Sequence, residues 1–412
     1  MNRRLLAAGL ASGVVWALLA YLSQTTSPLP FSIFALCLGG CVVCWLFGWR
    51  TAERESSART VVGFALLFRL CGFFGAPIYE DDWNRYLWDG RTMATTGNPY
   101  GKAPEQWFGE ELPEPFDDVL GRINFPGIPT IYGPVCQFSF LLAYWMAPGR
   151  LWSLKLVYLL ADLALMVLVW NRTRSPAKLL LYSWCPLVIK EVAFTAHTDV
   201  LAALFLTAAV LMAERYAISS GLLFGTAIAS KISMVAFAPL LLVQGKYLRA
   251  GLGVMAALTL WYAPFLLTGA TERDGLQAFA SHWEFNSTGY WVLQKLFGDL
   301  GGVAAGVLFL GFVAFALFKK TQWLRPDVLV AVFFVLAPVV NPWYLLVLAP
   351  LVALQPSTWG MAALSSVLLS YATFGNLQLA GQGLFDHPWW VRLLECLVIV
   401  AAIAWDNRRR GA

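Results

Sequence analysis

Long apolar runs separated by short polar gaps recur along the whole 412-residue chain. Many of them come near or above about 18 residues, the length that a helix needs to cross the hydrocarbon core of a bilayer. Charged residues make up 13% of the chain, about half the share usual in a soluble domain, and the mean hydropathy is +0.63. The pattern therefore predicts an all-α polytopic membrane protein without a separate soluble domain.

About twelve helices are expected to span the membrane. They cover residues 5–22, 31–49, 59–76, 151–170, 176–193, 199–214, 248–268, 301–318, 326–340, 343–355, 359–379 and 389–406. Two further apolar segments do not fit a simple crossing. Residues 132–148 are short and contain two prolines and Gln137, which favours a helix lying at the interface. Residues 221–243 have Lys231 in their middle, which favours a broken helical hairpin whose halves meet near this lysine.

The placement of basic residues predicts the orientation of these helices. Lysine and arginine gather in six short gaps, and the positive-inside rule assigns such gaps to the cytoplasm. Residues 77–150 and 269–300 then become two external loops, the first with interface helices, within a single transmembrane domain spanning residues 1–412. The basic residues lie in separate loops and form no continuous stripe, so nucleic acid is not an expected partner.

Residues 77–91, PIYEDDWNRYLWDGR, concentrate four acids and two arginines at the start of the first external loop. If this segment is helical, Asp82, Arg85 and Asp89 share one face while Asp81 points elsewhere. Two neighbouring carboxylates can then serve different tasks, one as general base and the other in binding a sugar, a metal or an arginine. Trp88 supplies an aromatic face suited to a sugar, and the arginines suit a phosphate. An ordinary acidic loop with ion pairs is the alternative.

Three further polar groups are expected on the external side. The segment TAHTD contains His197 and Asp199 at the mouth of a helix, where they form part of the same site or merely a helix cap. Two more segments, residues 282–290 and 343–344, contain aromatic, amide or hydroxyl groups. Such groups suit a carbohydrate pocket, but they also suit a belt of residues at the membrane interface. The candidates there are His282, Trp283, Asn286, Tyr290, Trp343 and Tyr344.

Lys231 is the most unusual charge, because a cation inside the membrane is costly unless it is paired or hydrated. It could contact a lipid phosphate, neutralise helix ends or extend to the cytoplasmic surface. The cysteines lie mostly in apolar runs, and Cys37, Cys41 and Cys44 have no histidine or carboxylate nearby, so they predict no metal site. No metal or cofactor is expected, and a divalent cation at the acidic motif is the disfavoured alternative.

The motif EDDWNRYLWDGRTMATTGNPY resembles the signature DD-x-x-RYLWDG…G-x-NPY of bacterial polyprenyl-phosphate-mannose-dependent glycosyltransferases of the GT-C superfamily. The resemblance continues in order through FPGIPTIYGPVCQ, CPLVIKEVAFTAHTDVL, a lysine in a broken helix, FASHWEFNSTGYWVL and NPWYLLVLAPL, and covers residues 77 to about 350. Each piece alone is weak, but the combination is specific for the superfamily. The chain departs from the pattern in two extra helices before the motif and in Glu80, which makes three consecutive acids.

The resemblance implies an inverting transfer of a sugar, with mannose expected, from a polyprenyl-phosphate donor to a glycan or glycolipid acceptor. The reaction would take place on the extracytoplasmic face of a bacterial inner membrane. By this resemblance Asp81 is the base and Asp82 supports it, although Glu80 leaves the choice of base open. The candidates for neutralising the donor phosphate are Arg85, Arg91, Lys231 and His197. Trp88, Asp89 and Asp199 join the aromatic and polar candidates above as sugar- or acceptor-binding residues.

Two alternatives stay open from the sequence. A transporter or flippase of lipid-linked sugars would use the same lipid partner without covalent chemistry, but it should line a path through the bilayer with polar groups. Here those groups gather at one external face, with Asp162 and Lys231 as the main exceptions. A glycosyltransferase that uses a different sugar, such as arabinose or glucose, is the second alternative.

Overall fold

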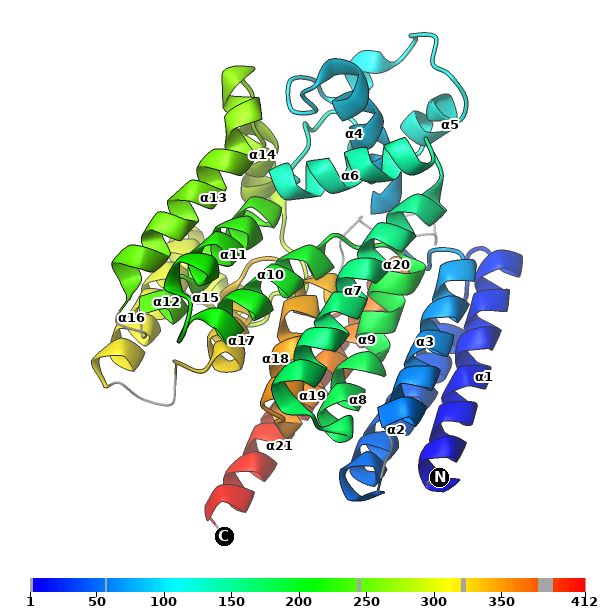
Figure 1. Ribbon diagram of the computed structural model, residues 1–412, viewed down its shortest axis with the longest axis vertical. Coiled ribbons are helices and arrows are strands. Elements are labelled where there is room, and N and C mark those ends of the chain that lie inside the picture. Colours follow the sequence, from blue (N-terminus) through cyan, green and yellow to red (C-terminus); the bar gives the residue numbers. More distant parts are fainter. Residues whose placement is uncertain (1–2, 56–57, 243–245, 320–323, 377–387, 412) are drawn as a thin grey trace. The chain divides into compact units, whose positions relative to one another are not determined.

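The computed structural model describes residues 3–55, 58–242, 246–319, 324–376 and 388–411 (Figure 1). Within these ranges, the side chains of residues 53–55, 282, 374–376 and 409–411 are not described. The described residues are helical apart from connecting segments and one isolated β-bridge between Phe285 and Val339. The prediction of an all-helical protein is therefore confirmed.

The chain divides into two compact units, each assembled from separate stretches of sequence. The first unit comprises Met1–Tyr79, Leu165–Phe194 and Glu284–Ala412, and the second comprises Glu80–Ala164 and Thr195–Trp283. Because both units are discontinuous in sequence, this division does not test the prediction of a single transmembrane domain.

The first unit consists of long apolar helices and several short ones. Its elements are α1 (Arg3–Thr25), α2 (Phe31–Glu55), α3 (Ala58–Phe74), α8 (Pro176–Ser183), α9 (Pro186–Val188), the π-helix η2 (Ile189–Phe194), α15 (Gly289–Phe297), η4 (Gly298–Leu300), α16 (Gly301–Phe318), α17 (Pro326–Leu336), η6 (Pro342–Val347), α18 (Leu348–Leu354), α19 (Thr358–Ser366), η7 (Val367–Ser370), α20 (Tyr371–Asn376) and α21 (Trp389–Gly411). In this unit α1 packs against α2 and α3, and α19 packs against α21.

The second unit contains the acidic motif. Its elements are α4 (Asp82–Thr96), η1 (Pro104–Trp107), α5 (Phe116–Gly121), α6 (Pro134–Met146), α10 (Asp199–Met212), α11 (Ala217–Ser230), η3 (Ile232–Phe237), α12 (Pro239–Leu242), α13 (Tyr247–Leu267) and α14 (Arg273–His282). The helix α7 (Leu151–Thr173) begins within the residues of this unit. Helix α4 packs against α5 and α6, and α11 packs against α6, α10 and α13.

Close helix contacts in the second unit depend on glycine. A Cβ atom on Gly90 of α4 would lie 2.6 Å from the carbonyl oxygen of Phe140 in α6. A Cβ atom on Gly221 of α11 would lie 1.9 Å from the carbonyl oxygen of Ala250 in α13. Both distances are shorter than any real contact of a Cβ atom allows, so only glycine lets these backbones approach so closely.

Within the described part of the chain, five helices are long and apolar enough to cross a bilayer. They are Arg3–Thr25, Phe31–Ala52, Leu151–Thr173, Tyr247–Leu267 and Gly289–Phe318. Together with five shorter apolar helices they support a helical membrane protein, whereas the count of about twelve spans stays a prediction. Helix α6 has 13 residues and rises about 20 Å, which is less than the thickness of the hydrocarbon core.

Two apolar segments differ from regular helices. The expected span at residues 176–193 is divided into α8, α9 and η2, with a break before Pro186, whose ring clashes with a preceding helical turn. Helix α11 ends at Ser230, Lys231 has extended backbone angles (φ −150°, ψ 113°), and η3 begins at the next residue. The expected break at Lys231 is thus confirmed, while the hairpin orientation of its halves stays a prediction.

Candidate functional site

Asp81 forms the N-cap of α4 and is half-buried. Its backbone carbonyl accepts hydrogen bonds from the backbone and side-chain nitrogens of Asn84, at 2.9 and 3.1 Å. Its carboxylate oxygen Oδ1 accepts a hydrogen bond from the side-chain amide of Asn124 at 2.5 Å. Partial burial raises the pKa of Asp81, and the Asn124 hydrogen bond opposes this shift. Asp81 is therefore a carboxylate oriented by an amide.

Asp82 is the first residue of α4 and has a different environment. Its Oδ2 atom accepts a hydrogen bond from the phenol of Tyr132 at 3.3 Å. Burial raises the pKa of Asp82 to about 7, the negative charge of Asp81 adds to this shift, and the Tyr132 hydrogen bond opposes it. Near neutral pH the two neighbouring carboxyl groups therefore differ in proton affinity, and Asp82 holds a proton more readily than Asp81.

The raised pKa of Asp82 predicts a pH-dependent stability. Below about pH 4 both the folded and the unfolded chain bind this proton, whereas between about pH 4 and 7 only the folded chain keeps it. The stability of the wild-type protein should therefore fall with rising pH across this window, relative to Asp82→Asn, by on the order of 2 kcal/mol for a half-buried group. Thermal unfolding of both proteins in the same detergent at pH 4.5 and pH 8 measures the difference. Parallel pH dependences of the two proteins would contradict the assignment.

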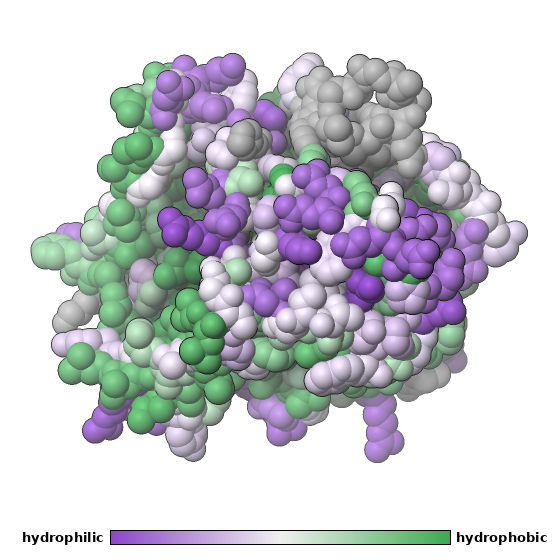
Figure 2. Space-filling model, turned by 90° about the horizontal axis from the view of Figure 1, so that it is seen from above, coloured by the Kyte–Doolittle hydropathy of each residue, from purple (hydrophilic) through white to green (hydrophobic). Residues whose placement is uncertain are grey.

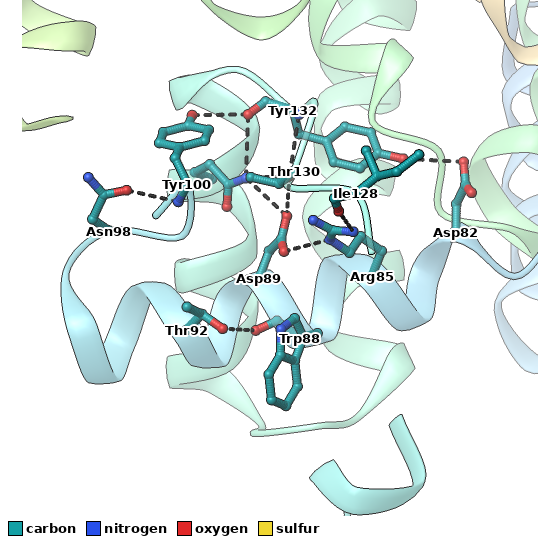
Figure 3. Close-up of polar contacts among 11 residues, drawn as sticks. Asp82, Arg85, Trp88, Asp89, Thr92, Asn98, Tyr100, Ile128, Thr130 and Tyr132 are labelled. Atoms are coloured by element: carbon teal, nitrogen blue, oxygen red, sulfur yellow. Dashed lines mark hydrogen bonds and ion pairs between the residues drawn. The ribbon is translucent and has the colours of Figure 1, made fainter. Parts of the chain in front are cut away.

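One face of α4 holds the segment around residue 130 in place (Figure 3). Arg85 Nε donates to Asp89 Oδ1 at 2.9 Å, and Arg85 Nη1 donates to the carbonyl oxygen of Ile128 at 3.0 Å. The buried Asp89 also accepts hydrogen bonds through Oδ2 from Thr130 at 2.5 Å and from Gln137 at 3.1 Å. The expected helical face of Asp82, Arg85 and Asp89 is confirmed, and the last two of these side chains fasten a loop to α4.

His197 is fully buried in the segment that leads into α10. Its Nδ1 atom lies 3.3 Å from the hydroxyl of Tyr86, and its Nε2 atom lies 3.8 Å from Oε2 of Glu80. Tyr86 in turn stacks on Phe140 of α6, with ring centroids 4.8 Å apart. The preceding residue, Ala196, has a φ of 56°, a conformation that a side chain disfavours and that occurs often at functional sites.

Asp199 and Lys231 form an ion pair at the break between α11 and η3. The side chain of Asp199 is 5% exposed and that of Lys231 is 24% exposed. The thiol of Cys136, in α6, contacts the carbonyl oxygen of Ser230 at 3.2 Å, which links the break to the helix after the Tyr132 segment. Two candidates that lie 32 positions apart in the sequence thus meet beside the acidic motif.

The charges of this site are not balanced evenly. Three of its acidic side chains lie beside a basic one, in the pairs Asp89–Arg85, Asp199–Lys231 and Glu80–His197. Among the described residues, neither Asp81 nor Asp82 forms an ion pair, and their hydrogen-bond partners are an amide and a phenol. These two carboxyl groups are therefore the ones that no neighbouring cation neutralises directly.

Trp88 and Arg91 lie away from this group. Figure 3 shows Trp88 on the opposite side of α4 from Asp89 and Arg85. Trp88 is 2% exposed and packs edge-to-face on Trp107, with ring centroids 5.8 Å apart. The guanidinium of Arg91 lies 5.3, 5.8 and 5.5 Å from the ring centroids of Trp88, Trp107 and Phe116. These contacts place both residues in a cation–π cluster, and their predicted substrate roles stay predictions.

Trp283 follows α14 and belongs to the second unit. It stacks on Phe279 with centroids 5.4 Å apart and meets Phe125 edge-to-face at 4.7 Å. His282 is the last residue of α14, and its side chain lies outside the described part of the chain.

The remaining candidates belong to the first unit and are described separately. The amide of Asn286, 4% exposed, donates to Glu395 Oε2 at 2.9 Å. Trp343 is 7% exposed and packs edge-to-face on Tyr344, at 6.1 Å between centroids. Tyr290 is half-buried at the start of α15. Their sugar-binding roles stay predictions.

Sequence reasoning did not assign roles to Asn124, Tyr132 or Tyr86, although they contact Asp81, Asp82 and His197. Asn124 and Tyr132 lie 43 and 50 positions after their carboxylate partners, so no local spacing could pair them. The density of glycine and proline around these residues predicted a structured loop but not its contacts.

Among the residues that the structure describes, no three histidine, cysteine, aspartate or glutamate side chains are grouped to hold a metal ion. Glu80, Asp81 and Asp82 are consecutive, but they contact different partners, namely His197, Asn124 and Tyr132.

A model of the MptA_B family, described as alpha-(1->6)-mannopyranosyltransferase, N-terminal domain, matches residues 6–246. This range covers more than half of the chain and contains the acidic motif, His197, Asp199 and Lys231. No curated protein and no solved structure matches the chain. The resemblance to mannosyltransferases inferred from the sequence is therefore confirmed.

Proposed function

The chain belongs to this family of alpha-(1->6)-mannopyranosyltransferases, and from that premise we propose that it is an inverting enzyme that uses a polyprenyl-phosphate mannose donor. The acceptor is a glycan or glycolipid of the cell envelope. One observation supports this proposal most: two adjacent carboxyl groups, free of ion pairs, lie in the same unit as the ion pair at the broken helix.

Asp81 is the proposed general base. Its carboxylate takes the proton from the acceptor's 6-hydroxyl group, whose oxygen attacks C1 of the donor mannose. The bond between C1 and the phosphate oxygen breaks, and polyprenyl phosphate leaves with the bonding electron pair. Because the product linkage is α and the reaction inverts the anomeric carbon, the donor must hold its mannose in the β configuration. The Asn124 amide fixes the orientation of the base.

Asp82 supports the base without replacing it. The two side chains are adjacent, and the charge of Asp81 contributes to the raised pKa of Asp82. A protonated Asp82 can donate a hydrogen bond to a sugar hydroxyl while Asp81 stays ionised, because two close carboxyl groups do not ionise equally. This division of tasks follows from their different partners, an amide for Asp81 and a phenol for Asp82.

Lys231 is the proposed cation for the donor phosphate. Its side chain is partly exposed, and it lies at a helix break. Negative charge grows on the phosphate oxygen as the C1–O bond breaks, and a fixed ammonium group stabilises that charge. Arg85, Arg91 and His197 stay predicted contacts of the phosphate, but each has a contact within the protein.

The proposed location is the bacterial inner membrane, with the site on the extracytoplasmic side. The long apolar helices support a location in the membrane. The six gaps that contain lysine and arginine support the proposed orientation, in which those gaps face the cytoplasm. Hydrophilic residues gather over α4 and α5 on the face seen in Figure 2, in keeping with a surface exposed to water. Asp89, Asp199 and the aromatic candidates, Trp88 and Trp283 among them, remain proposed contacts of the sugars.

A transfer assay in sealed vesicles tests the proposal. We expect right-side-out vesicles containing the protein and β-mannosyl polyprenyl phosphate to extend an added, impermeant α-(1→6)-mannobiose by one mannose. We expect inside-out vesicles to leave it unchanged and EDTA to have no effect on the rate. Mass spectrometry of the glycan measures the product.

Each arm of this assay can contradict one part of the proposal. Movement of the donor across the membrane without a new glycan product would favour a transporter. Product from inside-out vesicles alone would overturn the orientation. Loss of activity in EDTA, restored by a divalent cation, would overturn metal independence.

A further inference from the structure

The turn after Asn124 has a backbone conformation that its sequence disfavours. Phe125 has a φ of 52°, in the left-handed region, although it is a bulky residue and precedes Pro126. Two hydrogen bonds hold the turn closed: Ile128 N–H donates to the carbonyl oxygen of Phe125, and Glu105 N–H donates to that of Pro126, both at 3.0 Å. A strained residue that the surrounding structure holds in place occurs often at a ligand-binding site.

The turn is tied to the acidic motif on both sides of Phe125. Asn124, directly before it, donates to the carboxylate of Asp81 at 2.5 Å. Ile128, three positions after it, accepts a hydrogen bond from Arg85 at 3.0 Å. The strained phenylalanine is therefore held beside the residue that orients the proposed base, by residues of the motif itself.

Phe125 is 39% exposed, and its ring forms part of an aromatic cluster. It meets Trp283 edge-to-face, with centroids 4.7 Å apart and ring planes 73° apart. Trp283 is also stacked on Phe279 of α14. Helix α14 lies close against the same loop, since a Cβ atom on Gly275 would come within 2.5 Å of the carbonyl oxygen of Pro129. The cluster is thus built on two packed segments.

We propose that Phe125, supported by Trp283, is the platform on which the pyranose ring of the acceptor rests. This inference rests on the proposed function and names the acceptor side of the same site. The C–H face of a pyranose packs on an aromatic ring, and Asn124, the residue directly before Phe125, donates its amide hydrogen bond to Asp81. The ring of Phe125 then places the acceptor's 6-hydroxyl group within reach of the base.

A lipid anchor is the competing use of exposed aromatic residues near a membrane. One observation favours the sugar. Asn124 connects the cluster directly to a carboxylate, which a lipid anchor does not require. A second exposed aromatic, Phe108, which is 54% exposed, lies in the same external segment outside this cluster and provides a matched control.

Phe125→Gly is the most informative variant, because glycine accepts a positive φ without strain while it removes the ring. We expect a rise of about three- to tenfold in the KM for α-(1→6)-mannobiose, because the aromatic face is lost. The KM for the mannosyl donor should stay at the wild-type value. Phe125→Trp should keep the acceptor KM within about twofold, since it retains an aromatic face.

The control separates the sugar platform from a lipid anchor. Phe108→Ala should leave the acceptor KM unchanged. If Phe125→Gly and Phe108→Ala instead raise the donor KM by similar factors, both rings are lipid anchors and the platform is wrong. Product formation with an unchanged acceptor KM in Phe125→Gly would also overturn it.

Failure of the proposed function has a different signature. If the wild-type protein makes no mannosyl product, the transferase assignment fails. Binding then decides the platform: saturation-transfer NMR with α-(1→6)-mannobiose should give a signal for wild type that Phe125→Gly weakens. An equal signal for both proteins, or none for wild type, would overturn the platform.

Discussion

Asp81→Asn should abolish mannose transfer while leaving the fold and donor binding intact. The amide has the size of the carboxylate and can still contact Asn124, but it cannot accept a proton from the acceptor hydroxyl. Removal of a general base costs about 10²- to 10⁴-fold in rate, so we expect kcat to fall by at least about 10²-fold. Transfer from β-mannosyl polyprenyl phosphate to α-(1→6)-mannobiose measures kcat, and equilibrium binding of the labelled donor measures its affinity.

Asp117→Asn is the matched control for this variant. Asp117 is an exposed acid in α5, within the same external segment, and its removal should change kcat by less than about twofold. If Asp81→Asn retained more than half of the wild-type kcat while Asp82→Asn lost it, the base would be Asp82. If neither variant lost activity, Glu80, the third acid of the cluster, would become the candidate base.

Lys231→Met should have the second large effect, on both stability and transfer. Without its ammonium partner, the buried carboxylate of Asp199 loses its ion pair, which costs about 3 kcal/mol for a pair of this burial. We also expect a large rise in the donor KM, because the proposed contact with the phosphate is lost. Thermal unfolding in detergent and donor-dependent kinetics measure the two effects.

The double variant Lys231→Met with Asp199→Asn separates these effects. Replacing both members of the pair removes the isolated charge, so the stability should return to within about 1 kcal/mol of wild type. Donor affinity should not return, because no cation remains at the helix break. Recovery of transfer in the double variant would show that Lys231 serves only to neutralise Asp199, and the phosphate role would be wrong.

The pairing of Lys231 with Asp199 shows where inference from sequence reached its limit. The lysine was recognised as costly in an apolar segment, and a break in the helix was expected around it. The aspartate was recognised at a helix mouth. Their contact depends on how α10 and α11 pack, which local patterns do not encode because the two residues lie 32 positions apart.

The motif on α4 also shows what could and could not be predicted from the sequence, here for residues close together in the chain. Helical periodicity placed Asp82, Arg85 and Asp89 on one face, and the structure confirms this. Periodicity did not reveal that Arg85 and Asp89 are used to hold the loop at residues 128–130. The aromatic residue type made Trp88 a candidate sugar contact, but it could not show that this ring packs against Trp107.

Three properties followed from the sequence by itself: the lipid bilayer as the environment of the chain, its all-helical class and its family. Long apolar runs require a bilayer, regular backbone hydrogen bonding in a bilayer requires helices, and the ordered motifs point to the mannosyltransferases. Only the tertiary structure decided which acids stay free of ion pairs, and that Asn124 and Tyr132 contact them. The physical reason is that burial and charge pairing depend on distances in space between segments far apart in the chain, whereas hydrophobicity and periodicity are local properties.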